Sequence, residues 1–167
     1  ISAGLLIRSF HRLAGTDPGF DPHNVLTGAI VLPGSDYPEG KQQAAFFQRV
    51  LDRVQALPDV EVAAAVNSLP LTGINDQGSF RIEGRPNPPE GMDWVWPNRP
   101  KVSPRYFEAM GMTLLRGRNF TLQDREGAAE VAIVSDVAAR TYWPGEDPMG
   151  KRVSVNRRAG QPVWREI

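Results

Sequence analysis

A strand, a helix and a second strand follow one another between residues 24 and 67, and this order constrains the fold more than any other feature. Residues 24–32 are apolar and β-branched and stop at a Pro-Gly pair, which predicts a strand. Residues 41–57 carry apolar side chains three and four positions apart, which predicts an amphipathic helix. Residues 60–66 are again apolar and predict a second strand. This order is best satisfied by a right-handed crossover with both strands parallel in one sheet.

A single unit of this kind buries only one side of its helix and leaves the edges of its sheet open. The sheet therefore needs further strands, supplied by later residues or by chain outside residues 1–167. The sequence also stops inside a predicted strand, residues 162–167. We therefore expect a fold that is truncated at the C-terminus.

Composition excludes several classes of function. The chain has 19 basic and 19 acidic residues and no net charge, and no segment concentrates basic residues, so nucleic acid is not an expected partner. It contains no cysteine, which rules out disulfides, zinc ribbons and thiol catalysis but leaves the compartment open. The 16 glycines and 15 prolines favour a protein of strands and turns over a helical bundle.

The N-terminus allows two interpretations. Residues 1–7 are apolar or small, and Arg8 and Arg12 follow them. They could form a short amphipathic helix packed on the domain, or the last turns of a transmembrane helix whose arginines lie at the level of the headgroups. The residues alone favour neither interpretation.

Shorter elements are predicted after residue 68. Ser103 followed by proline predicts a capped helix that ends at Gly111, and Ser135 predicts the cap of a second helix, residues 136–142. The remaining predictions are strands at 79–83 and 131–134, a strand or tight extended segment at 114–120, and a hairpin of 151–155 with 162–167.

No pattern of residues supports catalysis or a bound cofactor or metal. Residues 145–151 have the glycine and lysine spacing of a phosphate-binding loop, but Arg152 stands where a Ser or Thr would hold magnesium, and a helix rather than a strand precedes them. We interpret this segment as a turn. His11 and His23 have no carboxylate at ligand spacing, and we expect both on the surface.

Seven short stretches, taken in their order and spacing, resemble the MacB-like periplasmic core domain. This family lies between the transmembrane helices of FtsX-like ABC transporter permeases, and the resemblance is strongest to the large two-repeat bacterial type. At Asp59 the family usually has glycine. The stretches that carry the resemblance are residues 4–10, 17–26, 56–60, 68–71, 102–107, 114–120 and 143–151.

The resemblance implies an α+β fold in three parts. Residues 1–24 would be the end of a transmembrane helix and its linker. Residues 25–68 would form a porter-like β-α-β half, which is half of a ferredoxin-like split, and residues 69–167 a β-rich mixed α/β inserted subdomain that is incomplete. The second half of the porter-like unit is expected beyond Ile167.

The implied function is that of a non-catalytic periplasmic domain in the inner membrane, which couples cytoplasmic ATP hydrolysis to efflux or to the handling of a substrate. Its expected partners are a cytoplasmic ABC ATPase subunit, a periplasmic adaptor or substrate, and the membrane through the full-length chain. We expect Trp94, Trp96 and Arg85 to mark the surface where a substrate or partner docks. Tryptophans on strands are, however, more often part of a core.

Two functions of other classes are weighed against this one. A small hydrolase on a ferredoxin-like scaffold would need an anion-binding loop with a nearby Arg or Asn and a positioned water, and the sequence shows no such cluster. A polar pocket that gathers Arg81, Arg85 and Arg118 would support it. A free-standing periplasmic binding module would need no membrane anchor before residue 1.

Overall fold

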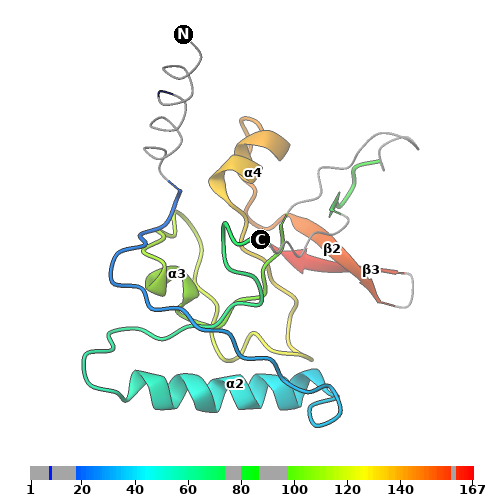
Figure 1. Ribbon diagram of the computed structural model, residues 1–167. Coiled ribbons are helices and arrows are strands. Elements are labelled where there is room, and N and C mark those ends of the chain that lie inside the picture. The colour runs from blue at the N-terminus through cyan, green and yellow to red at the C-terminus, as the bar shows by residue number, and fades with distance from the viewer. Residues whose placement is uncertain (1–7, 9–17, 74–79, 87–97, 159–160) are drawn as a thin grey trace.

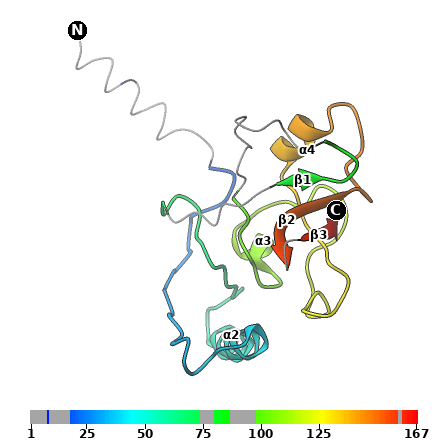
Figure 2. The same cartoon turned by 90° about the vertical axis from the view of Figure 1, so that its right-hand side faces the viewer.

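The computed structural model describes residue 8 and residues 18–73, 80–86, 98–158 and 161–167. In this part of the chain helices accompany an antiparallel sheet, so the fold class is α+β, as predicted. Helix α2 lies at the opposite end of the molecule from α4, with α3 and the sheet between them (Figures 1 and 2). The elements are α2 (Gly40–Gln55), β1 (Arg81–Ile82), α3 (Tyr106–Ala109), α4 (Asp136–Tyr142), β2 (Arg152–Arg158) and β3 (Gln161–Glu166).

The sheet has three antiparallel strands in the order β1-β2-β3. The predicted hairpin is confirmed as β2 and β3, in which Arg152 lies opposite Glu166. The predicted strand 131–134 is reduced to a single parallel bridge between Val131 and Glu166. Around it, the N–H of Ala132 donates to the carbonyl of Glu166 at 2.8 Å.

The core lies between α4 and the face of the sheet that carries Phe80 and Val153. These two side chains and Trp143 at the end of α4 are buried, with Trp143 only 2% exposed. The alternation of a strand places Phe80 and Ile82 on the same face. The rings of Phe80 and Tyr142 lie 4.7 Å apart. Burial of this cluster fixes α4 against the sheet.

The predicted helix over residues 41–57 is confirmed as α2, although none of its residues is fully buried. Asp59 follows it with a φ of 67°, in the left-handed region that favours glycine. This turn therefore explains why glycine suits the position in the family that the chain resembles.

The two strands predicted on either side of α2 do not form in the described part of the chain. Residues 24–32 join no sheet there; Asn24 lies in a turn with a φ of 57°, and Leu26 is 98% and Val31 89% exposed. Residues 60–66 form only one antiparallel bridge, between Val66 and Val102. A β-branched sequence becomes a strand only where a neighbouring strand supplies backbone partners.

Residues 114–120, predicted as a strand or a tight extended segment, form no strand. One further prediction was wrong in detail. Ser103 does not cap a helix, because α3 begins only at Tyr106 and the Ser103 hydroxyl instead accepts the N–H of Ala65 at 2.8 Å. By contrast, Ser135 caps α4 by accepting the N–H of Ala138, and Gly111 ends α3 with a φ of 62°.

Candidate functional site

The predicted docking surface is described only at Arg85, because Trp94 and Trp96 lie outside the described residues. Arg85 is exposed on the turn after β1, where its N–H donates to the carbonyl of Ile82 at 3.2 Å. The pKa of the Glu146 carboxyl is lowered, first by its hydrogen bond from Lys151 and more weakly by the charge of Arg85. The charge of Arg85 therefore acts on the turn over residues 145–151.

This turn is the segment with the spacing of a phosphate-binding loop. Its lysine, Lys151, forms an ion pair with Glu146, and the N–H of Glu146 donates to the carbonyl of Trp143 at 3.0 Å. The N–H of Met149 donates to the carboxylate of Asp147 at 3.1 Å. The Lys151 ammonium and the Met149 N–H thus bind carboxylates within this segment. The prediction of a turn is confirmed.

The three arginines whose gathering in one pocket would support a hydrolase are each placed differently. Arg118 is held by Asp124, Arg85 lies on the turn after β1, and Arg81 lies on β1 opposite Ser154. Neither of the two clefts described below is lined by any of them. The described residues therefore give the hydrolase alternative no support.

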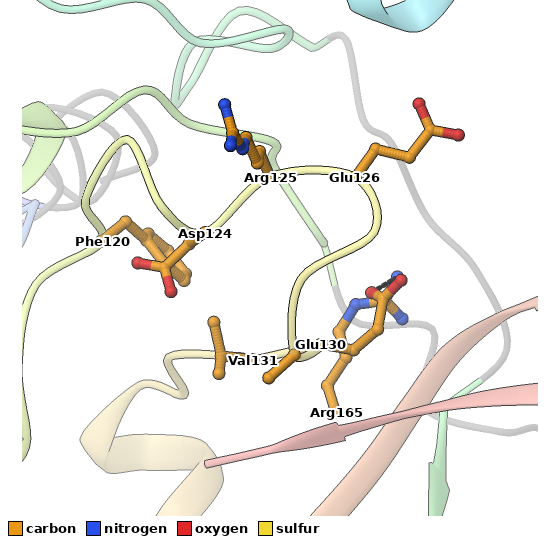
Figure 3. Close-up of a pocket in the computed structure, with 8 residues that line it drawn as sticks. Phe120, Asp124, Arg125, Glu126, Glu130, Val131 and Arg165 are labelled. Carbon is orange, nitrogen blue, oxygen red and sulfur yellow. Dashed lines mark ion pairs between the residues drawn. The ribbon is translucent and has the colours of Figure 1, made fainter.

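One cleft, of about 270 Å³, lies beneath the loop of residues 121–130 (Figure 3). Phe120 and Val131 form apolar parts of its wall. At one end Arg165 forms an ion pair with Glu130 at 3.0 Å. The full lining is Phe120, Asp124, Arg125, Glu126, Ala129, Glu130, Val131 and Arg165. We call it the Phe120 cleft.

The wall of the Phe120 cleft is fixed by Asp124. Its carboxylate accepts two hydrogen bonds from the guanidinium of Arg118, each 2.7 Å long, and one from the N–H of Thr121 at 2.7 Å. These bonds favour the charged form, and the pKa of Asp124 is therefore held far below its ordinary value of 3.8. The spacing of Thr121 and Asp124 also matches a helix cap, but here it closes a turn.

We expect the Asp124 carboxylate to stay ionised in acid well below pH 3.8. Its folded pKa is depressed, so it stabilises the fold above its unfolded pKa, and that contribution is lost as the pH falls through the folded pKa. A carboxyl titration followed by NMR measures this, and Arg118→Ala should raise the midpoint. A midpoint near 3.8 in the unchanged protein would refute the described geometry.

A second cleft, of about 600 Å³, forms where residues 18–23 cross the end of α3. We call these residues the N-terminal linker. The N–H of Asp21 donates to the carbonyl of Met110 at 2.9 Å, and the Asp21 carboxylate pairs with His23 at 2.7 Å. In the sequence this contact is indicated by Gly111 alone, which the local pattern predicts as the end of a helix.

Among the described residues, no group of three or more His, Cys, Asp or Glu side chains could hold a metal ion. In the same part of the chain, no helix has the length and apolar character needed to cross a membrane. The predicted end of a transmembrane helix falls almost entirely outside the described residues.

Comparison with protein families identifies the class. The family model for the MacB-like periplasmic core domain matches residues 17–163, which is most of the chain. The chain therefore belongs to this family, the periplasmic core domains of MacB-like ABC transporter permeases.

One relative of known function matches a shorter segment. The chain is 32% identical over 57 residues to the macrolide export ATP-binding/permease protein MacB of Mannheimia succiniciproducens. The match covers 34% of this chain but only 9% of that protein, so the chain spans a small part of its relative. No solved structure matches.

Proposed function

We propose that this chain is a non-catalytic, extracytoplasmic domain of an ABC transporter permease in the inner membrane. In this proposal a cytoplasmic ATPase hydrolyses ATP, and the domain couples that hydrolysis to efflux or to the handling of a periplasmic substrate or adaptor. The observation that carries the proposal is the family match over residues 17–163. Further support comes from the relative that is named as a macrolide export ATP-binding/permease protein. Export and ATP binding are activities of that whole protein.

We further propose that α2 and its flanking segments are half of a porter-like subdomain, completed by chain beyond Ile167. The exposure of Leu26 and Val31 supports this, because an apolar, β-branched segment that joins no sheet among the described residues is suited to pairing with a further strand. Hydrogen exchange in the full-length protein tests it. Slow exchange of the amides of residues 24–32 is expected, whereas exchange at the rate of an open chain would refute the pairing.

The surface of Trp94, Trp96 and Arg85 remains our proposed docking site for a substrate or periplasmic partner. Trp94→Ala and Trp96→Ala in the full-length permease are expected to reduce transport roughly tenfold, as loss of an aromatic contact at an interface does. The measurement is transport by reconstituted permease and ATPase, with the melting temperature of each variant as its control. Unchanged transport, or transport lost only together with folding, would show that the two tryptophans are not a docking surface.

A further inference from the structure

One side chain at the C-terminal end of α2 joins three segments of the chain. The amide nitrogen of Gln55 donates to the carbonyls of Val60 at 3.1 Å and Glu61 at 2.9 Å. Its oxygen accepts the N–H of Ala63 at 2.9 Å and Nη1 of Arg105 at 3.0 Å. A carboxamide has two N–H donors and two acceptor lone pairs, so all four are used.

Arg105 is itself held in place by a second pair of bonds. Its Nε and Nη2 donate to the two carboxylate oxygens of Glu108 at 2.8 and 2.7 Å, which leaves Nη1 directed at Gln55. Two parallel bonds of this kind fix the plane of a guanidinium. Arg105 also has a φ of 65°, an uncommon backbone conformation for a residue with a side chain. The arginine is therefore placed at a defined angle at the start of α3.

Residues 60–67, which follow α2, are also hydrogen-bonded to the chain that precedes α3. The N–H of Ser103 donates to the carbonyl of Ala65 at 2.9 Å, and the Ser103 hydroxyl accepts the N–H of Ala65. The N–H of Lys101 donates to the side-chain oxygen of Asn67 at 2.7 Å. Residues 60–67 thus lie between α2 and the segment that precedes α3, with hydrogen bonds to both.

The opposite end of α3 contacts the N-terminal linker. The carbonyl of Met110 accepts the N–H of Asp21, and a methyl group added at Gly111 would lie 2.9 Å from the Cβ of Asp21. Helix α3 is a single turn long, so its two ends are only a few residues apart. It therefore contacts the linker at one end and α2, through Arg105, at the other.

We propose that α3 is a connecting element that ties the N-terminal linker to α2, with Gln55 and Arg105 as its positioning residues. A displacement of the linker is then expected to act on α2 through Arg105 and Gln55, which are joined by a hydrogen bond of 3.0 Å. The use of this connection in transport rests on the proposed function. The connection itself rests only on the hydrogen bonds above.

Hydrogen exchange followed by mass spectrometry in the full-length protein tests the connection. Gln55→Ala is expected to speed exchange at Ala63 and also in α3, at Ala109 and Met110, by roughly threefold to tenfold, as loss of one or two hydrogen bonds does. Gln48→Ala is the matched control, since Gln48 lies on the same helix and is bonded to Asp52 alone at 2.8 Å. Faster exchange at Ala63 without any change in α3 would overturn the proposal.

A second variant separates the contact with α3 from the contacts within residues 60–63. Gln55→Glu has the same size and keeps the acceptors for Ala63 and Arg105, but it cannot donate to the carbonyls of Val60 and Glu61. We expect it to leave exchange in α3 unchanged; α3 exchange as fast as in Gln55→Ala would refute the role of Arg105. Neither readout needs transport, so a failure of the proposed function would leave these results unaffected.

Discussion

Replacing Trp143 with alanine is expected to lower the free energy of unfolding by about 3–5 kcal/mol. Trp143 is 2% exposed and fills the space between α4 and the sheet, beside Phe80 and Val153. Its removal loses the apolar burial of the indole and leaves a cavity that the surrounding strands fill only in part. Equilibrium unfolding in urea measures the change.

The control for this variant is Leu115→Ala, because Leu115 is 73% exposed. It should change the free energy of unfolding by no more than about 0.5 kcal/mol. Equal effects for the two variants would show that α4 is not packed on the sheet as described.

Gly111→Ala is expected to be the second most damaging of the substitutions considered. Gly111 has a φ of 62°, and an added Cβ would lie 2.9 Å from the Cβ of Asp21. The variant therefore combines backbone strain of about 1–2 kcal/mol with a steric conflict that costs at least about 1 kcal/mol more. The free energy of unfolding gives the sum, and faster hydrogen exchange at Asp21 shows where the linker has separated from α3.

Gly127→Ala isolates the backbone strain from the contact. Gly127 also has a positive φ, of 89°, but nothing lies within 4 Å of the position where its Cβ would be. It should lose only the conformational part of the energy. If the two alanine variants are equally destabilised, the linker does not pack on Gly111.

The elements that were predicted correctly are those with a local cause. The spacing of apolar residues and a closing proline define α2, and Ser135 caps α4 with a bond to an amide three residues away. The hairpin of β2 and β3 likewise joins neighbouring segments. Sequence patterns report such short-range interactions directly.

The incorrect predictions concern segments whose structure depends on distant partners. Residues 24–32 and 60–66 have the composition of strands, but strand pairing needs a neighbour that composition does not specify. Ser103 had the local signal of a cap, yet its hydroxyl bonds to Ala65, 38 residues away. A long-range contact overrides a local preference here.

The candidate site was even less accessible from sequence. Arg85 could be placed on a turn, but the connection through Gln55 and Arg105 could not have been predicted. Nothing local distinguishes Gln55 from Gln48 on the same helix; the difference is that residues 60–63 turn back toward one of them. The Phe120 cleft likewise brings together residues that are distant in the sequence, since Glu130 and Arg165 form an ion pair at one end of it.

Labelling of a single introduced cysteine tests most directly whether this is the extracytoplasmic domain of a permease. The 167 residues contain no cysteine, and Ala128 is exposed, so Ala128→Cys provides one reactive position in this part of the full-length protein. The parent protein without the substitution is the control. We expect a membrane-impermeant maleimide to label the variant in cells whose inner membrane is intact and whose outer membrane has been permeabilised. Labelling that occurs only after the inner membrane is broken would contradict the account.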